Sequence, residues 1–386
     1  MSNRKNATAV ALLLCVSVAA AAAGSVMAVG PQRAVKTLAE AAALARDGDT
    51  IEVDAGLYAR DVAVWTQNDL AVRAVGGRVR LLADGAAAED KAIWVVRGGR
   101  ISIEGFDFEG ARVAGRNGAG IRFEAGLLSV RDCRFIGNEM GLLTGNDTAA
   151  VLSIENSEFA YNQRPDGHDH NLYVGTIRQV TVTGSLLHHA LHGHLLKSRA
   201  ALSVILYNRL VDGFGGGASY EMEFPNGGVA VVVGNVVEQG PGTENPQLIS
   251  FGAEGYRWPA NELFLVHNTL VDASGRPGVF LRVYPGAGAL RIVNNLLVGD
   301  ARWEVDEKIP AEWRGNAAIG PDSIDPDDYR LRRDLRLASG AARAAGAAHG
   351  MALAPVSEYV HPRRTRVLDS PPIRPGAMQS LAGPSR

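Results

Sequence analysis

Cysteine is almost absent from this chain of 386 residues, which contains only Cys15 and Cys133. We expect Cys15 to leave with an N-terminal signal, so the mature chain retains a single cysteine and forms no intramolecular disulfide. Hydrophobic residues nevertheless make up 46% of the chain, which is enough for a large core. The fold must therefore be stabilised by packing and not by covalent bridges.

An excess of charge of either sign is also missing. The formal net charge is −2, and it becomes −4 without residues 1–28, which contain Arg4 and Lys5 and no acidic residue. Proteins that bind nucleic acid usually concentrate positive charge on one face. The composition therefore gives no reason to expect a nucleic-acid partner.

Long apolar runs are absent beyond the N-terminus. Arg4 and Lys5 precede an apolar run from Ala9 to Ala23, which is shorter than the roughly 20 residues that span a bilayer. Small residues around Ala28 suit a cleavage site, so residues 1–28 are predicted to be a signal peptide. We expect an exported protein, periplasmic or extracellular, without a membrane span.

A motif of alternating apolar residues, a turn residue and an apolar pair recurs eight times. The flanking segments are rich in Val, Ile and Leu and alternate with a period of two, as strands do. Residues 50–300 contain no apolar stripe of helical period, which excludes a helical solenoid. The turn residues, 24 to 33 positions apart, are Gly105, Asp132, Asn156, Gly184, Asn208, Asn235, Asn268 and Asn295.

The turn residues are of the types that tolerate a left-handed backbone. We therefore expect them to occupy equivalent corners of successive coils, and the 45 glycines of the chain to lie largely in turns. Stacked Asn side chains can also hydrogen-bond along a column. A structural role is predicted for Asn208, Asn235, Asn268 and Asn295.

This repeat unit of about three short strands resembles the right-handed parallel β-helix of the pectin-lyase-like superfamily. The segments GDTI at residues 48–51 and GLY at 56–58 are similar to the opening of such proteins. The resemblance implies one all-β solenoid of about ten coils. We expect an N-terminal capping helix within residues 29–47, the β-helix at 48–319, and a tail at 320–386 that caps the last coil.

The resemblance also implies that a flat outer sheet holds a polysaccharide. The strands expected to form that sheet are GIRFE, GLLTG, NLYVG, HLLKSR, YEMEF, LISFG and VFLRVY. Ionisable residues concentrate at positions 166–256, beside these strands. The candidate site is therefore predicted in the central coils.

Six of the nine histidines lie between residues 168 and 194. His168 and His170, like His192 and His194, have the spacing of metal ligands on an extended segment. No carboxylate ligand accompanies either pair, which disfavours a transition-metal site, and no metal site is assigned.

The same region contains two further candidate features. His188 and His189 follow an apolar pair, which indicates a turn or a surface position. Asp166 and Asp169 leave a calcium site open, since polysaccharide enzymes of this fold often use calcium.

Glu221 and Glu223 are two residues apart on a predicted strand. Strict alternation would send both carboxyls outward with Lys197, about 6.6 Å apart, near the carboxylate spacing of inverting glycoside hydrolases. The same groups suit a lyase, in which a base removes the proton next to a uronate carboxyl and a cation neutralises the developing charge. Ion pairing with Lys197 and Arg199 is the structural alternative.

Lys197-Ser198, followed by Tyr207-Asn208, loosely resembles the strand of β-helix alginate and chondroitin lyases in which the lysine is the base. Those enzymes carry an arginine one coil later, where this chain has Glu221 and Glu223. His194 and Tyr173 are alternative proton-transfer groups. Lys197, Glu221, Glu223, His194 and Tyr173 are the candidate catalytic residues.

The favoured hypothesis is a monomeric carbohydrate-active enzyme that cleaves a uronate-containing polysaccharide by β-elimination. The alternatives are a glycoside hydrolase using the two glutamates and a non-catalytic glycan-binding protein. Predicted substrate-binding residues are His170, Arg199, Tyr220, Glu254, Trp258, Arg282 and Tyr284.

Overall fold

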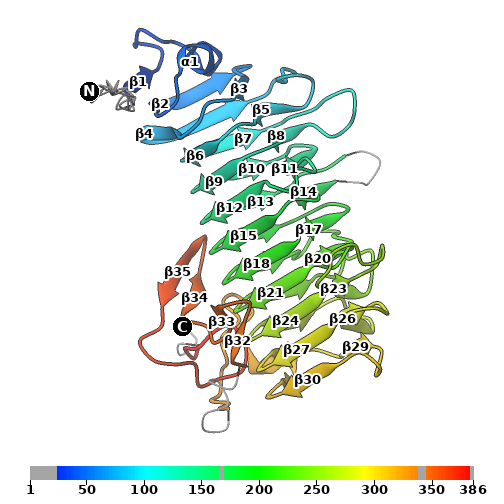
Figure 1. Ribbon diagram of the computed structural model, residues 1–386. Coiled ribbons are helices and arrows are strands. Elements are labelled where there is room, and N and C mark those ends of the chain that lie inside the picture. Colours follow the sequence, from blue (N-terminus) through cyan, green and yellow to red (C-terminus); the bar gives the residue numbers. More distant parts are fainter. Residues whose placement is uncertain (1–23, 165–168, 338–344, 383–386) are drawn as a thin grey trace, which may run out of the picture.

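The computed structural model describes residues 24–164, 169–337 and 345–382 (Figure 1). Parallel strands stack coil upon coil, and each strand pairs with its equivalents one coil before and one coil after. The predicted all-β parallel solenoid of about ten coils is confirmed. Three faces run along it, here named sheets 1, 2 and 3.

Sheet 1 has ten strands and consists of the predicted polysaccharide-sheet segments with additions at both ends. Its strands are β3 (Ala63–Trp65), β5 (Ala92–Val96), β8 (Ala119–Phe123), β11 (Met140–Thr144), β14 (His170–Val174), β17 (His194–Ser198), β20 (Tyr220–Phe224), β23 (Gln247–Phe251), β26 (Gly278–Val283) and β29 (Ala301–Val305).

Sheets 2 and 3 join where the long strands β2 and β4 pair. Sheet 2 contains β1 (Val26–Val29), β2 (Thr50–Ala59), β4 (Leu70–Leu82), β6 (Arg100–Glu104), β9 (Leu127–Arg131), β12 (Val151–Glu155), β15 (Gln179–Thr183), β18 (Leu202–Leu206), β21 (Val229–Val233), β24 (Glu262–Val266), β27 (Ala289–Val293) and β30 (Ala311–Arg314). Sheet 3 contains β7 (Phe106–Glu109), β10 (Arg134–Ile136), β13 (Glu158–Ala160), β16 (Leu186–His188), β19 (Arg209–Val211), β22 (Val236–Gln239), β25 (Thr269–Asp272), β28 (Leu296–Val298) and β31 (Ala317–Ile319).

Apolar side chains fill the interior of the coil in columns. Phe108, Phe135 and Phe159 occupy one register position on sheet 3, and their rings stack with centroids 5.0 and 4.6 Å apart and planes within 6° of parallel. Each ring buries apolar area against the ring of the next coil. This column keeps the neighbouring coils in register below the central part of sheet 1.

A polar ladder runs through the interior at the corner between sheets 2 and 3. From Asn208 onward the Asn amides bond from coil to coil, with Nδ2 to Oδ1 distances of 3.0, 3.0, 3.1 and 2.9 Å. The ladder comprises Asn208, Asn235, Asn268, Asn295 and Asn316, and Ser157 and Ser185 continue it toward the N-terminus. The structural role predicted for these asparagines is confirmed.

The eight predicted turn residues do not share one position, which corrects the expectation of equivalent corners. Gly105, Asp132, Asn156 and Gly184 have positive φ angles, whereas in later coils positive φ falls one residue before the ladder Asn, at Tyr207, Gly234, His267 and Asn294. The ladder asparagines bond inward without adopting that backbone. Asn suits both the position with a positive φ angle and the adjacent position that bonds along the ladder, so residue type alone does not distinguish the two positions.

The helix α1 (Leu38–Leu44) lies at the N-terminal end of the coil (Figure 1). Leu38 and Ala41 are buried in the core, and Thr37 accepts a hydrogen bond from the Glu40 N–H as an N-cap. Asp61 anchors the helix by accepting bonds from the N–H groups of Leu38 and Ala39 at 2.8 and 3.0 Å.

The described structure includes residues that precede the predicted signal boundary. β1 pairs with β2 from Val26 onward, and the Ser25 N–H and hydroxyl both donate to Asp49 at 2.8 Å. Cleavage near Ala28 would remove most of β1. The signal boundary at residue 28 therefore stays a prediction.

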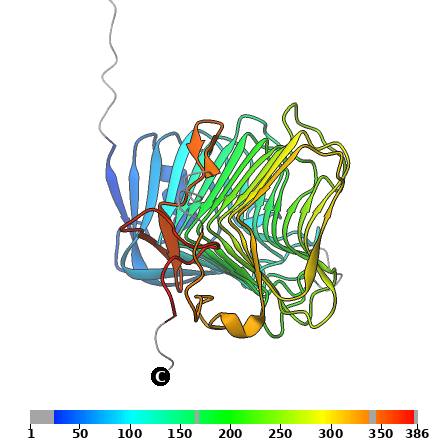
Figure 2. The ribbon, with the colours of Figure 1, turned by 90° about the horizontal axis from the view of Figure 1, so that it is seen from below.

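The described part of the C-terminal tail lies beside the coil, as Figures 1 and 2 show. Ala345, Ala348 and Leu353 cover outward valines of sheet 2, and Ile324, Tyr329, Leu331, Ala377 and Met378 cover those of sheet 3. Its elements are the 3-10 helix η1 (Pro321–Ser323), β32 (Ala347–Ala348), β33 (Met351–Ala352), β34 (Ser357–Val360) and β35 (Arg364–Val367). At the last coil, Trp303 of β29 packs against the core.

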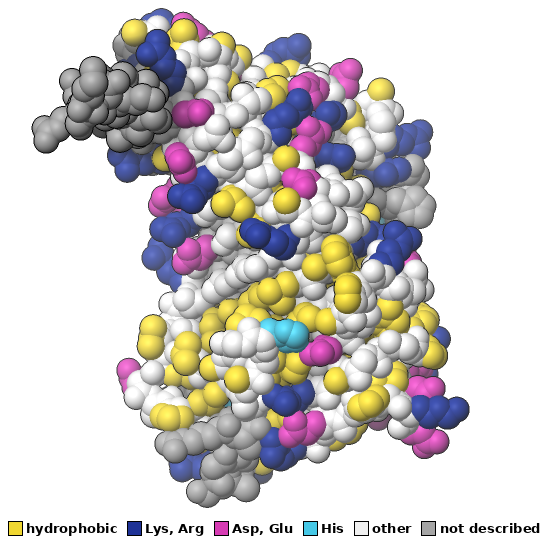
Figure 3. Space-filling model, viewed as in Figure 1, with side chains coloured by type: hydrophobic (Ala, Val, Ile, Leu, Met, Phe, Trp, Pro, Cys, Tyr) yellow, Lys and Arg dark blue, Asp and Glu magenta, His cyan; other side chains and the backbone are white. Residues whose placement is uncertain are grey.

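Charged side chains on the outside pair between coils. Arg131 and Glu155, in register on β9 and β12, form an ion pair at 3.2 Å, and Figure 3 shows basic and acidic groups intermixed over the face in view. Such exposed pairs contribute little stability. In the described part of the chain, no helix has the length and hydropathy of a bilayer-spanning segment.

Candidate functional site

The strands of sheet 1 do not alternate strictly. Their second and third residues both point into the core, as shown by the fully buried pairs Leu195/Leu196 and Leu248/Ile249. In the register between neighbouring strands, the first and third residues have partners and the second residue is skipped. The first and fourth residues therefore both point outward. This bend recurs in successive coils and decides which side chains can reach a ligand.

The fourth positions form a column of polar side chains along the outer face. Tyr173, Lys197, Glu223, Ser250 and Arg282 follow one another in register from β14 to β26. Neighbouring strands are about 4.8 Å apart. A chain molecule lying along the sheet would meet these side chains in succession.

Lys197 lies at the centre of an ion cluster. Its Nζ is 2.8 Å from Oε2 of Glu223 and 3.2 Å from Oε1 of Glu254. The Lys197 side chain is 11% exposed and that of Glu223 is 5% exposed, whereas that of Glu254 is 41% exposed. Glu254 therefore forms the solvent-facing side of the cluster.

Arg199 extends the cluster beyond the end of β17. Its two Nη atoms donate to the two carboxyl oxygens of Glu254 at 2.5 and 2.8 Å, its Nε donates to the Tyr173 hydroxyl at 2.9 Å, and Nη1 also donates to Asn226 Oδ1 at 2.5 Å. The guanidinium hydrogen bonds and the nearby Lys197 charge lower the pKa of Glu254 to about 2, against the effect of its partial burial.

His194 supports the cluster from the side. Its Nε2 is 2.8 Å from Oε2 of Glu223, and its ring packs against those of His170 and Tyr220 with centroids 4.6 and 5.0 Å away. Burial lowers the pKa of His194. Burial alone would raise the pKa of Glu223, but His194 and Lys197 hold it below its usual value. Glu223 is thus an anion between two donors.

Glu221 is on the opposite side of the sheet, which overturns the prediction that it shares a face with Glu223. It occupies the second position of β20, in the column of Leu195 and Leu248, and is completely buried. Burial and the nearby Asp212 raise its pKa well above the usual value. The bend in the strand, absent from the assumed alternation, is the physical reason for the error.

The other predicted binding residues surround the cluster. His170 and Tyr173 pack together with ring centroids 5.2 Å apart, whereas the Trp258 indole N–H donates to the Arg199 carbonyl at 3.0 Å and so supports the end of β17. Arg282 lies two coils beyond Glu223, with its guanidinium 4.9 Å from the Tyr284 ring centroid. Arg282 and Tyr284 therefore form a separate pair, outside the ion cluster and farther along the column.

Asn226 was not identified from the sequence, although it contacts Arg199 directly. It follows Phe224 and Pro225, and its side chain donates to the Gly255 carbonyl at 3.1 Å, which ties it to the turn that carries Glu254. Its only sequence signal is an Asn-Gly-Gly turn directly after a strand of sheet 1.

A resident metal does not fit the described residues. Of the two aspartates considered for calcium, Asp166 lies outside the described residues and Asp169 is completely buried, with its pKa raised to about 6 by burial. Within residues 24–164, 169–337 and 345–382, no three His, Cys, Asp or Glu side chains are arranged to hold an ion. His168 also lies outside these ranges. No step is therefore assigned to a metal.

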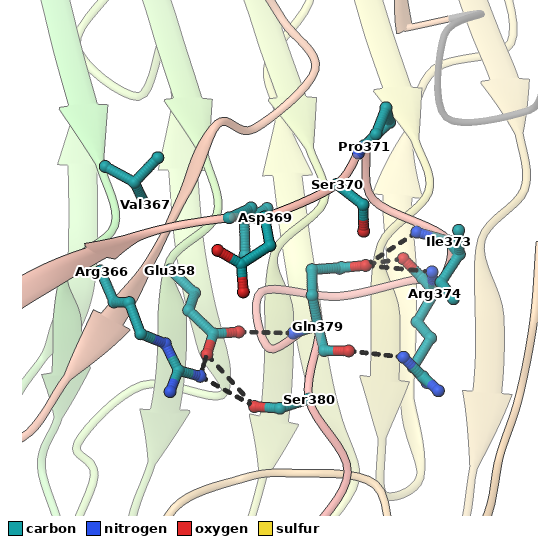
Figure 4. A pocket seen from close by; sticks show the side chains of 11 residues that line it. Glu358, Arg366, Val367, Asp369, Ser370, Pro371, Ile373, Arg374, Gln379 and Ser380 are labelled. Atoms are coloured by element: carbon teal, nitrogen blue, oxygen red, sulfur yellow. Dashed lines mark hydrogen bonds and ion pairs between the residues drawn. The ribbon is translucent and has the colours of Figure 1, made fainter.

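A polar hollow of about 220 Å³ lies in the C-terminal tail, away from sheet 1 (Figure 4). Its buried Glu358 accepts hydrogen bonds from the Gln379 N–H at 2.8 Å and from the Ser380 hydroxyl at 3.2 Å, and it pairs with Arg366. These contacts satisfy the carboxylate within the tail itself. The network holds β34 and β35 to the final segment of the chain.

The fold is shared with solved structures. A crystal structure of pectate lyase Pel9A superposes with a TM-score of 0.54 at 14% sequence identity, covering 81% of this chain and 85% of that one. The chain has the pectin-lyase-like β-helix fold. The PL6 family polysaccharide lyase Pedsa3628 from Pseudopedobacter saltans also matches, with a TM-score of 0.37 at 12% identity, covering 80% and 97%. No protein-family description and no curated protein sequence matches this β-helix chain.

Proposed function

We propose that the protein is an exported polysaccharide lyase that cleaves a uronate-containing chain by β-elimination on the outer face of sheet 1. The observation that carries the proposal is the convergence of Lys197, Arg199 and Tyr173 beside Glu223 in one column-based cluster. The fold shared with Pel9A, a pectate lyase, adds support.

In this reaction the proton next to a carboxylate is removed, and the negative charge that develops spreads onto the carboxyl oxygens. Arg199 presents two donors that already bind a carboxylate as a fork, and Lys197 becomes a second positive charge as it takes the proton. These cations stabilise the enediolate-like transition state more than the ground state. Arg199 is therefore assigned to charge neutralisation.

Lys197 is assigned as the base. To act, its ammonium transfers a proton to Glu223, 2.8 Å away, and the resulting amine accepts the proton from the sugar carbon. Because Glu223 has a lowered pKa, this neutral amine is a minor form of the pair, and its population does not change with pH because the transfer keeps the number of protons on the pair constant. His194 is a positioning residue that holds Glu223.

Tyr173 is assigned as the acid. Its oxygen accepts a hydrogen bond from Arg199, so its own hydroxyl hydrogen remains available for the leaving oxygen. The C–O bond at the β carbon breaks, the C–H electron pair becomes a C=C bond, and the leaving oxygen takes the Tyr173 proton. Lys197 is again an ammonium at this point, and after product release Tyr173 regains a proton and Glu223 loses one by exchange with solvent.

A glycoside hydrolase based on Glu221 and Glu223 is not supported, because the Glu221 carboxyl lies inside the coil. The remaining rival is a binding protein without turnover. Both are distinguished from a lyase by the product, since β-elimination leaves an unsaturated uronate that absorbs near 232 nm and hydrolysis does not.

The test uses the exported full-length protein on a panel of acidic and neutral polysaccharides. We expect absorbance at 232 nm with at least one uronate polymer, and its loss in Lys197→Ala and Tyr173→Phe with melting temperatures close to the wild type. Lys308→Ala, on an exposed loop at the far end of the coil, is the matched control. New reducing ends without the absorbance would contradict the lyase proposal, as would full activity of Lys197→Ala.

A further inference from the structure

We infer that Glu254 occupies the site of the substrate carboxylate, as an internal stand-in that a uronate group must displace. The inference rests on the proposed function only for the identity of the ligand. Both Glu254 oxygens are bound by cations, one by Arg199 Nη1 and the other by Arg199 Nη2 and Lys197 Nζ. This is the fork geometry in which a guanidinium recognises a free carboxylate.

The position of Glu254 in the coil also sets it apart from its partners. Lys197 and Glu223 are fixed on strands, but the register partner of Glu223 on β23 is Ser250. Glu254 comes from the turn after β23 and reaches back to β17, two coils away. It therefore enters the cluster from outside and is not part of the column of sheet 1.

The turn that carries Glu254 is bounded by Gly252 and Gly255, both with positive φ angles of 89° and 82°. The side chain is 41% exposed, whereas that of Arg199 beneath it is 16% exposed. A carboxylate on the solvent side of two less exposed cations can turn away without uncovering the apolar core. The structure thus places the exchangeable anion on the outside.

The charge balance gives the ligand its chemical class. With Glu254 in place, the charges of Lys197, Arg199, Glu223 and Glu254 cancel. When Glu254 turns away, one positive charge is left over, and the group that balances it best is a single carboxylate. A uronate matches this vacancy in charge, and a neutral hexose does not.

Displacement makes Glu254 a determinant of specificity, because only an anionic sugar can compete for the two cations. It also keeps Lys197 paired until substrate arrives. Exchange of the carboxylates therefore couples binding of an acidic sugar to exposure of the assigned base.

The first experiment needs no knowledge of the natural substrate, since acetate serves as the carboxylate probe. In Glu254→Ala we expect 100 mM sodium acetate to raise the melting temperature by about 2 °C relative to sodium chloride of equal ionic strength. The wild type should show no such difference. Glu244→Ala is the matched control, because Glu244 is similarly exposed, at 45%, and pairs only with the exposed His192 at 2.9 Å in the described structure.

The second experiment uses Glu254→Gln, which keeps size and hydrogen bonding but removes the charge. On a uronate polymer that the wild type cleaves, we expect KM to fall about tenfold. An increase in KM, or equal acetate effects in the Glu254 and Glu244 variants, would overturn the inference. A specific acetate effect without cleavage of any polymer would instead reject the lyase function and leave the carboxylate site standing.

Discussion

Glu221 and Glu223 stand two residues apart on β20, yet Glu221 points into the coil, where it is completely buried near Asp212, and Glu223 points out into the ion cluster. The bend at the second position of each sheet 1 strand separates them. Glu221 is a buried acid whose pKa is raised by burial, and Glu223 is held by His194 and Lys197, which lower its pKa. The two residues therefore have unrelated roles.

The same isosteric substitution should separate these roles. We expect Glu223→Gln to lower kcat/KM at least 100-fold, because it removes the charge that accepts the Lys197 proton, which corresponds to about 2.7 kcal/mol. Glu221→Gln should remain within a few-fold of the wild type. Initial rates at 232 nm measure both. Similar losses in the two variants would contradict the assignment of a site to the outer face alone.

Stability should fall as pH rises through neutrality. The pKa of Asp212 is raised from 3.8 to about 7 by burial, and the pKa of Glu221 is raised well above its usual value by burial and by Asp212, Glu238 and Asp272. For an acid with a raised folded-state pKa, the stabilising proton is bound at low pH and lost as pH rises through that pKa. Buried histidines titrate below about pH 6.5, so the effect of the buried acids on stability is best measured above that pH.

Between pH 6.5 and 8.5 we expect the free energy of unfolding of Glu221→Gln to rise relative to that of the wild type by about 1 kcal/mol per pH unit. Thermal melts of the two proteins across this window measure the difference in melting temperature. Glu244→Gln, at an exposed carboxylate, serves as the control. A constant difference between Glu221→Gln and the wild type across the window would refute the buried titration.

The buried Asn ladder should contribute substantially to the free energy of unfolding. Asn268 accepts from the Asn235 backbone and side chain at 2.9 and 3.0 Å and donates to Val232 O at 2.9 Å. Asn268→Ala removes these bonds and leaves the buried Asn235 backbone N–H without its acceptor, whereas the Asn235 side chain still donates to the Ile205 and Val233 carbonyls. We expect the free energy of unfolding to fall by about 2 to 4 kcal/mol. Asn268→Ser should lose less, because Ser157 and Ser185 fill the ladder in earlier coils.

Urea unfolding monitored by tryptophan fluorescence measures these losses, with Gln163→Ala as an exposed control. Equal stability of the Ala variant and the control would show that the ladder is not a structural element.

The mature N-terminus is predicted to begin at or before Ser25. Ser25 bonds to Asp49, and β1 covers the edge of β2. A chain that starts at Val29 should therefore melt several degrees below one that starts at Gly24. Mass spectrometry of the exported protein gives the cleavage position directly, and a mature chain beginning at Val29 would contradict the prediction.

The sequence of the later strands of sheet 2 indicates that another segment of the chain covers their outer face. Strands β12 and β15 alternate polar and apolar residues, but β21 reads VAVVV and is buried on both sides. A continuous apolar strand in a solenoid indicates that something covers its outer face. The tail residues Ala345 and Leu353 are that cover.

The sequence by itself determined the parallel β-helix, the strands of sheet 1 and the group of residues from which the site is drawn. Period-two patterns and a repeated turn are local properties, and they specify stacked coils without knowledge of the rest of the chain. The strands HLLKSR and YEMEF thus appear in sheet 1 as predicted.

Only the tertiary structure decided which of those residues meet. The facing of Glu221 depends on a bend that shifts the side-chain period by one residue, and a shift of one residue exchanges inside for outside. Glu254 contacts Lys197 and Arg199, which precede it by 57 and 55 residues in the sequence. The turn that brings Glu254 to them follows a path that no local pattern specifies. Side-chain facing and long-range contact are properties of the assembled coil.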